Sequence, residues 1–269
     1  MKQSYLLACL SSLLLAFVCV IPASGSLVPA LRAPGGVSDF GTVANSATVR
    51  MDNTMTLEAW LYPTSWRSYT GREKHGLNFI YKGRIGSYIE YVFALQENGI
   101  LCLGNTWGCI GVLNRRVPLN QWTHVAVTLD GRQGVLYLNG KPVGVNNSVN
   151  LMPADLGLVN CWLGRSQSSA DPFFRGQLDS VVLSSAALWP EQTLVAPPLD
   201  AVVADQALRL SWPPWGAGFA LWSVSEITGT APWSPVVQEP EVADGLWTLS
   251  MPVAGSKRFY RLQWPWPTP

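Results

Sequence analysis

Hydrophobic and polar residues alternate in short segments along most of the chain, and no segment shows the spacing of an amphipathic helix. Alternation with a period of two is typical of a β-strand with one buried face. Between residues 27 and 184 it predicts about a dozen strands separated by turn residues. The clearest are residues 55–62, 87–96, 122–129, 160–164 and 176–183. So many strands do not fit one flat sheet, so the pattern predicts an all-β domain of two packed sheets.

One turn in this series has a specific signature. Residues 133–138 alternate and end at Asn139-Gly140, after which a further short strand follows. An Asn-Gly pair favours a two-residue type I′ turn, because both turn positions need a positive φ. The sequence therefore predicts a tight hairpin at this point.

The pattern changes at residues 185–198, which read as a turn followed by a Pro-containing linker, and a second series of strands follows. The last six residues are rich in Pro and cannot pair within a sheet. The predicted parts are a signal peptide (1–25), a two-sheet domain (26–188), a linker (189–200), a small Trp-rich β-sandwich-like module (201–263) and a loose tail (264–269).

The N-terminal segment is typical of an export signal. Lys2 precedes an apolar stretch from residue 6 to residue 20, and small residues lead to a cleavage site after Gly25. This stretch is shorter than the roughly 20 residues that a membrane-spanning helix needs. We therefore expect a secreted or extracellular protein that does not span the membrane after cleavage, with the periplasm or the cell surface as alternatives.

Composition narrows the classes of partner. The 269 residues include 18 Lys and Arg and 17 Asp and Glu, which gives a net charge of +1. This balance excludes sequence-independent binding of nucleic acid, which needs a concentrated positive surface. With 48% hydrophobic and only 13% charged residues, the chain does not have the composition of a disordered protein.

Three cysteines remain after the predicted cleavage, namely Cys102, Cys109 and Cys161. A two-residue turn at Asn105-Thr106 would place Cys102 opposite Cys109, and export permits a disulfide between them. Cys161 is the alternative partner of Cys109. No Cys or His cluster has the spacing of a zinc site.

Several segments resemble, in order and spacing, a laminin-G-like domain of the concanavalin A-like lectin/glucanase superfamily. These segments are Thr56–Pro63, Gln121–Gly131, Leu136–Val143, and Leu163-Gly164 with Phe174–Leu183. The resemblance implies a jelly roll with one concave and one convex antiparallel sheet. The end of the chain, at residues 258–262, is similar to short fibronectin-like modules.

This superfamily contains glycosidases as well as lectins, so the fold alone does not decide the function. Retaining glycosidases need two carboxylates about 5 Å apart. Glu58 and Glu90 would form such a pair beside His124 if their strands were neighbours with matching faces. The alternative is that Glu58 is the ordinary acid of its family segment. Because the Glu-x-Asp-x-x-Glu pattern of laminarinase-type enzymes is absent, we expect no enzyme and keep the glycosidase as the less favoured alternative.

Carbohydrate binding is better supported by the residues. Sugars stack their C–H faces on aromatic rings and bind planar side chains with several donors. The long loop at residues 64–76 offers both kinds, and Trp107 offers a further ring. The predicted ligand-binding residues are Trp66, Arg67, Tyr69, Arg72 and Trp107. The alternative is that these aromatics cap the end of the sandwich. Trp60, Trp122 and Trp162 lie within the family segments, and we expect them to serve packing.

The resemblance also implies a structural calcium ion, which several oxygen ligands would bind. Asp179 matches a position where relatives carry an acid, and Asp39 lies in the early strand that approaches it. The alternative is that either acid caps a turn. The sequence as a whole predicts a secreted, non-catalytic recognition protein that binds a glycan or a cell-surface partner. A structural or adhesion protein that contacts other proteins is the alternative.

Overall fold

The computed structural model divides the chain into two compact units, with the boundary between Leu194 and Val195. Each unit is described by itself. The structure describes residues 26–27, 41–45, 54–66, 77–84, 88–96, 98–105, 108–109, 116–149, 159–167, 174–188, 194, 196–227, 232–253 and 257–265. These residues contain no helix with the length and hydrophobicity that crossing a membrane requires.

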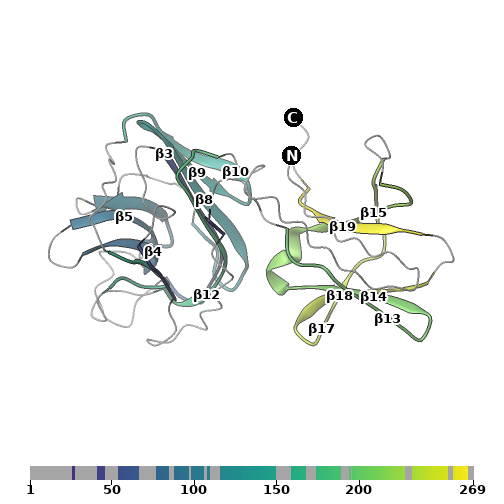
Figure 1. The fold of residues 1–269 in the computed structure, drawn as a ribbon. Coiled ribbons are helices and arrows are strands. Elements are labelled where there is room, and N and C mark those ends of the chain that lie inside the picture. Colours follow the sequence, from purple (N-terminus) through teal and green to yellow (C-terminus); the bar gives the residue numbers. More distant parts are fainter. Residues whose placement is uncertain are drawn as a thin grey trace. The chain divides into compact units, whose positions relative to one another are not determined.

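The first unit is a sandwich of two antiparallel six-stranded sheets (Figure 1). In spatial order the first sheet contains β1 (Ser26–Leu27), β12 (Gly176–Ser184), β3 (Thr54–Pro63), β8 (Thr123–Asp130), β9 (Gln133–Leu138) and β10 (Lys141–Asn146). The second contains β2 (Gly41–Val43), β11 (Cys161–Leu163), β4 (Leu77–Arg84), β5 (Tyr88–Leu95), β6 (Leu101–Asn105) and β7 (Gly108–Cys109). This arrangement confirms the all-β fold with two packed sheets.

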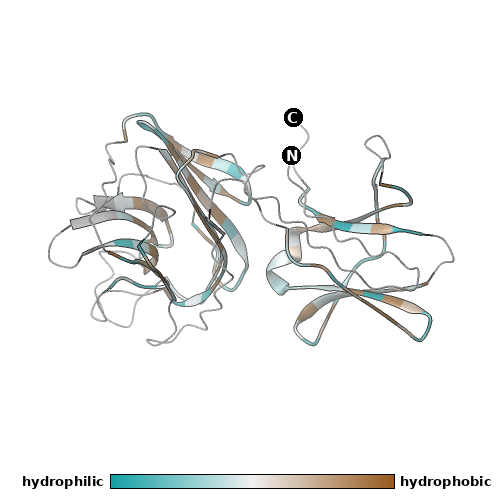
Figure 2. Ribbon diagram, viewed as in Figure 1, coloured by the Kyte–Doolittle hydropathy of each residue, from teal (hydrophilic) through white to brown (hydrophobic). Residues whose placement is uncertain are grey.

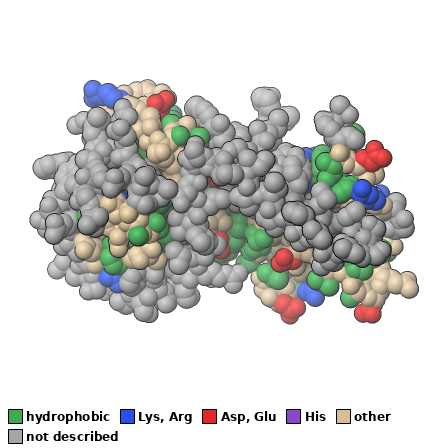
Figure 3. Space-filling view, in the orientation of Figure 1, with side chains coloured by type: hydrophobic (Ala, Val, Ile, Leu, Met, Phe, Trp, Pro, Cys, Tyr) green, Lys and Arg blue, Asp and Glu red, His purple; other side chains and the backbone are tan. Residues whose placement is uncertain are grey.

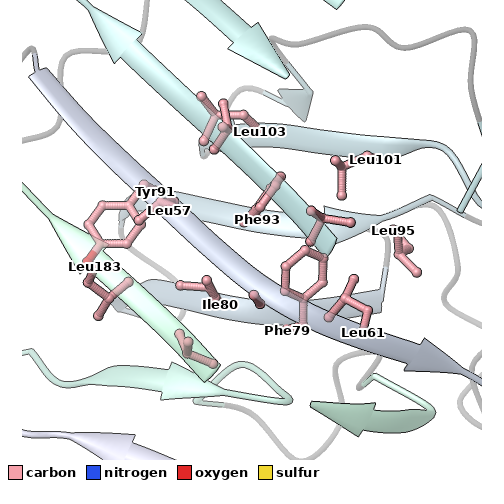
Figure 4. Packing of buried hydrophobic residues seen from close by; sticks show 14 of the residues in the cluster. Leu57, Leu61, Phe79, Ile80, Tyr91, Phe93, Leu95, Leu101, Leu103 and Leu183 are labelled. Carbon is pink, nitrogen blue, oxygen red and sulfur yellow. The ribbon is translucent and has the colours of Figure 1, made fainter. Parts of the chain in front are cut away.

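The core of the first unit lies between the two sheets. Leu57 and Leu61 of β3 and Leu183 of β12 pack against Phe79, Phe93 and other apolar side chains of the second sheet (Figure 4). Their side chains are fully buried. In β3 the core residues occupy every second position, as the sequence pattern predicts. The residues between them therefore point away from the second sheet.

The predicted hairpin joins β9 and β10. Asn139 and Gly140 form its turn with φ values of 49° and 73°, and Lys141 pairs with Leu138. Two consecutive positive φ angles are the geometry that favours Asn-Gly. The prediction of a tight turn at this pair is confirmed.

The second unit contains two smaller antiparallel sheets. The four-stranded sheet has the order β13 (Asp200–Ala204), β14 (Ala207–Trp212), β18 (Leu246–Pro252) and β17 (Glu241–Ala243). The three-stranded sheet has the order β16 (Ser234–Pro235), β15 (Ala220–Val224) and β19 (Phe259–Gln263). A 3-10 helix, η2 (Pro214–Gly218), follows β14, and the Trp247 indole donates a hydrogen bond to its Pro214 carbonyl oxygen at 3.2 Å.

Hydrophobic and hydrophilic residues follow one another along the strands of both units (Figure 2). In the second unit this interleaving places Leu210, Trp212 and Leu249 in the interior. Tyr260 of β19 donates a hydrogen bond to the Met251 sulfur of β18 at 3.2 Å. Burial raises the pKa of the Tyr260 phenol above its usual 10.0, and the charge of Arg258 opposes part of that shift.

Two features of this unit differ from the expectations. Trp264, the first residue of the predicted loose tail, packs edge-on against Phe219 with ring centroids 5.3 Å apart. The packed part of the unit therefore extends beyond residue 263. The edge strand β13 is exposed at all five positions and includes Val202 and Val203.

Candidate functional site

Trp66 is held in a fixed position at the end of β3, and its ring is half-buried. Its indole Nε1 donates a hydrogen bond to the Val117 carbonyl oxygen at 3.0 Å. The ring also lies directly against Gly99, where a Cβ atom would stand 2.5 Å from the Trp66 Cε2. Gly99 has a φ of +81°, which L side chains rarely adopt, so both the conformation and the space favour glycine.

The segments around Trp66 are tied together by backbone contacts. The Val117 amide donates to the Gly99 carbonyl oxygen at 2.9 Å, and Ile100 forms a β-bridge with Arg116. Asn98 stabilises the turn at residues 98–100, because its Oδ1 accepts a hydrogen bond from the Ile100 amide at 3.0 Å. Three segments far apart in the sequence therefore converge on one rigid position.

Arg116 lies beside this ring. Its guanidinium carbon is 5.5 Å from the Trp66 ring centroid, and the residue is exposed. We call Trp66, Gly99, Arg116 and Val117 the Trp66 platform. It combines a rigid aromatic surface with a planar cation that has five N–H donors, which are the groups that bind sugars.

Only part of the predicted binding loop is described. Of the predicted ligand-binding residues, Trp66 lies within the described part of the chain. Arg67, Tyr69, Arg72 and Trp107 lie outside it, so their roles stay predictions. Sequence reasoning did not select Arg116, which reaches Trp66 only through the pairing of residues 99–100 with 116–117.

A second aromatic surface lies on the outer face of the second sheet. Tyr81, Val92 and Ala94 form a buried cluster there, and the half-buried Trp162 packs against it. The Arg165 guanidinium is 5.5 Å from the Trp162 ring centroid, and its Nε donates to the Ser166 carbonyl oxygen at 3.0 Å. Trp162 therefore packs on the outer face of its sheet, and Trp60, which is 2% exposed, likewise points away from the core between the sheets.

Glu58 and His124 form a buried pair on β3 and β8 of the first sheet. Glu58 Oε1 and His124 Nε2 are 2.9 Å apart, and the side chains are 2% and 0% exposed. The contact is electrostatic, because its geometry is not that of a hydrogen bond; Glu58 Oε2 and His124 Nδ1 also have no hydrogen-bond partner. The ring of Trp60 lies 5.4 Å from that of His124. Since both side chains are closed to solvent, a substrate does not reach this pair.

The topology separates Glu58 from Glu90. Glu58 lies on β3, between Leu57 and Ala59, which both point into the core, so the Glu58 side chain points away from the second sheet. Glu90 lies on β5, which belongs to the second sheet. The condition for pairing these two carboxylates beside His124 is therefore not met, because their strands are not neighbours.

The outer face around Glu58 is covered in part by the chain that follows β12. The Thr54 hydroxyl donates to the Ser185 carbonyl oxygen and the Thr56 hydroxyl to that of Ala186, each at 2.8 Å. The Leu188 amide donates to the Thr56 oxygen at 2.8 Å. These contacts explain how polar residues come to be buried on an outer sheet face.

Asp179, one of the two predicted calcium ligands, lies on β12 and is 3% exposed. The Ser180 hydroxyl donates to its Oδ1 at 3.1 Å, next to a bulge in the pairing with β3. Calcium takes six to eight oxygen ligands. The described residues contain no group of three His, Cys, Asp or Glu side chains that could hold a metal, and Asp39 lies outside them. Asp179 alone does not fit a calcium site, so this cofactor stays a prediction.

The hairpin that carries the predicted disulfide has a different register from the expected one. Gly104 pairs with Cys109 and Asn105 with Gly108, so the turn lies one residue later than predicted and Cys102 is not opposite Cys109. Cys102 is nevertheless disulfide-bonded in the structure, so the shifted register does not prevent it from forming a bridge. A Cys102–Cys109 disulfide stays a prediction.

The alternative disulfide, between Cys109 and Cys161, is wrong. Cys161 lies on β11 and Cys109 on β7, and β4, β5 and β6 lie between them in the sheet. Four strand spacings correspond to about 19 Å. Disulfide-bonded residues have Cα atoms about 4.4–6.8 Å apart.

Comparison with protein families finds one match. Residues 35–193 match a laminin-G model that describes the concanavalin A-like lectin/glucanases superfamily. The match covers more than half of the chain and lies over the sandwich of the first unit. No curated protein matches the sequence.

Three solved structures are similar to the chain at low identity. One is domain 4 of AbnA, an extracellular GH43 arabinanase from Geobacillus stearothermophilus, with 16% identity, a TM-score of 0.45 and coverage of 64% of this chain and 89% of that one. Another is the CBM40 of the Ruminococcus gnavus IT-sialidase, with 14% identity, a TM-score of 0.46 and coverage of 64% and 97%. The third is the SAP-like pentraxin of Limulus polyphemus, with 16% identity, a TM-score of 0.42 and coverage of 60% and 78%.

Proposed function

Because the chain belongs to the concanavalin A-like lectin/glucanase superfamily, we propose that it is an exported, non-catalytic protein that binds carbohydrate. The observation that carries the proposal is the Trp66 platform, where a half-buried indole is fixed by a hydrogen bond and lies beside an exposed arginine.

The physical case rests on preorganisation. A sugar binds weakly to a mobile side chain, because ordering that side chain costs conformational entropy. The Trp66 ring is already held by Val117 and Gly99, so this cost is met when the protein folds. Its remaining surface can stack on the C–H face of a sugar, while Arg116 donates hydrogen bonds to the hydroxyls.

The non-catalytic part of the proposal rests on the carboxylates. Hydrolysis of a glycosidic bond by the usual mechanism needs two carboxyl groups on either side of the bond. Glu58 is buried against His124, and Glu90 belongs to the other sheet. The acid pair that the sequence suggests is therefore not available for this chemistry.

A glycan array with the full chain tests the proposal. We expect wild-type protein to bind at least one glycan class and Trp66→Ala to lose that binding. Trp66→Phe keeps a ring but removes the indole donor, so it should retain part of the binding and control for folding. A blank array with protein that is folded by circular dichroism would contradict the proposal and favour the protein-contacting alternative.

A matched variant decides where the site lies. Trp162→Ala removes the second aromatic surface and should leave binding unchanged. If Trp162→Ala abolishes binding and Trp66→Ala does not, carbohydrate binding stands but the Trp66 platform is the wrong site.

Export is tested separately. Expression in a secreting host should release protein whose N-terminal residue is Ser26, as the proposed cleavage after Gly25 requires. N-terminal sequencing of the released protein measures this directly. Retention of residues 1–25 in the released protein would contradict a cleaved signal.

A further inference from the structure

Arg116 differs from the other arginines for which contacts are described. Arg209 pairs with Asp244 at 3.5 Å, Arg165 donates to the Ser166 carbonyl, and Arg261 donates to Gln263 at 2.8 Å. The Arg116 guanidinium has no hydrogen-bond or ion-pair partner among the residues that the structure describes. Its donors therefore face solvent beside the Trp66 ring.

Arg116 is the charged residue of the described part of the platform. The described residues that build it, 61–66, 98–100 and 116–120, include no Asp or Glu. Arg67 directly follows Trp66 and Arg115 directly precedes Arg116 in the sequence, whereas Glu97 is the acid next to this turn.

The chain as a whole is nearly neutral, with a net charge of +1. On the face that Figure 3 shows, the described acidic and basic side chains are scattered in ones and twos. An exposed arginine with no hydrogen-bond or ion-pair partner among the described residues, next to a fixed indole, is thus a specific feature of the platform. A guanidinium forms a planar fork that matches a carboxylate in a bidentate contact.

We infer that the carbohydrate bound at the Trp66 platform is a hexuronate, with its sugar face on the Trp66 indole and its carboxylate on the Arg116 guanidinium. The inference rests on the proposed function and adds the class of sugar. The carboxylate of a hexuronate is attached at the edge of the sugar ring, so it projects beyond the stacked face. The Arg116 guanidinium carbon lies over the Trp66 ring at 5.5 Å from its centroid, so a carboxylate on a sugar that stacks on the remaining surface of the indole can meet it.

The test compares ligands that differ only in charge. Isothermal titration calorimetry is performed on the full chain with oligosaccharides of galacturonate, glucuronate and mannuronate, each as the free acid and as its methyl ester. The ester keeps the stacking surface and removes the negative charge. We expect at least one free acid to bind about 10-fold or more tightly than its ester at low salt, and the difference to shrink as ionic strength rises.

Variants assign the preference to one side chain. Arg116→Gln should bring the acid and its ester to within about twofold of each other while ester binding persists, and Arg116→Lys should keep part of the preference. Arg132→Gln removes an exposed arginine from the β8–β9 turn of the same unit and is the matched control, which should keep the full preference.

The outcomes separate the two proposals. Equal binding of acids and esters, or an unchanged preference in Arg116→Gln, would overturn the hexuronate inference and leave carbohydrate binding intact. Binding of neutral glycans on the array without any binding of the three acids would do the same. A lack of binding to every glycan would overturn both.

Discussion

The two units each contain a tryptophan next to an arginine, and the two pairs have opposite environments. In the second unit, the Arg261 guanidinium lies 4.1 Å from the Trp233 ring centroid, and the residue is only 9% exposed. Its Nη2 donates to the Gln263 side chain, and its cross-strand neighbour is Trp222. In the first unit, Arg116 is exposed and 5.5 Å from the Trp66 ring centroid.

The comparison shows that a cation–π contact does not by itself identify a binding site. Arg261 contributes to the outer face of the three-stranded sheet, where a buried aliphatic stem and a bonded head group complete the packing. Arg116 has the same chemistry with its donors still available. A third pair, Trp60 with His124, is fully buried, and His124 Nε2 already lies 2.9 Å from Glu58 Oε1.

The largest expected effect is a loss of stability at the buried Glu58–His124 contact. Glu58→Ala removes one partner of the pair and leaves His124 without compensation, so the first unit should lose about 3–5 kcal/mol of unfolding free energy. Urea unfolding at neutral pH measures the loss. The Glu58→Ala/His124→Ala double variant should lose clearly less than the sum of the single variants. If the loss of unfolding free energy in the double variant equals the sum of the two single losses, the 2.9 Å contact contributes nothing to stability.

The next largest effect is a difference in stability loss between variants of Arg261 and Arg116. Arg261→Ala should destabilise the second unit by about 2 kcal/mol, since it removes a ring contact and a charged hydrogen bond together. Arg116→Ala should change the stability of the first unit by less than about 0.5 kcal/mol. Thermal unfolding of both variants provides the measurement. Equal losses would remove the distinction between a packing arginine and a binding arginine.

A substitution at Gly99, which lies against the Trp66 ring, tests whether the fixed position of the ring is needed for binding. Gly99→Ala places a Cβ atom against the ring and adds backbone strain, so we expect a loss of about 1–2 kcal/mol and weaker glycan binding. Gly131 is the matched control, because it also has a positive φ of +60° but open space where a Cβ atom would lie. Gly131→Ala should therefore be strained without affecting binding. Normal glycan binding by Gly99→Ala would show that the fixed ring position is not required.

The smallest effect concerns the second unit at alkaline pH. Because the pKa of Tyr260 is raised in the folded state, its stabilising contribution is complete below pH 10 and is lost as the pH rises through the folded pKa. Urea unfolding from pH 8 to pH 11.5 should show this decline, and Tyr260→Phe should reduce it. A steeper decline in Tyr260→Phe would mean that another group titrates.

The sequence predicts the strands that alternate and misses those that do not. β3 and the β9–β10 hairpin follow a strict period of two and an Asn-Gly turn, and both are recognisable without a structure. β4 contains two register shifts, between Asn78 and Ile80 and between Lys82 and Gly83, and each shift breaks the alternation. The β4 strand is therefore hidden from pattern reasoning.

The sequence predicts one residue of the candidate site, Trp66, but not its neighbour Arg116. Trp66 stands out because it lies in a long loop among polar and aromatic residues. Arg116 is 50 residues away, and only the bonding of Val117 to Gly99 brings it to the same position. Trp162 packs as its family segment suggests, and only the structure shows that it does so on the outer face of its sheet. The hairpin register at Cys109 was missed by one residue, since two adjacent turn positions offer similar residues.

The exposed strand β13 has a consequence for how the protein behaves at high concentration. It is the last strand of its sheet in the described part of the chain, and Val202 and Val203 are 57% and 48% exposed. A flat apolar edge with unpaired peptide groups can add a strand from another molecule, and natural sheets usually prevent this with lysine, proline or a bulge. None of these devices lies within residues 200–204. Self-association should therefore begin at this edge, and a single lysine at position 203 should delay it.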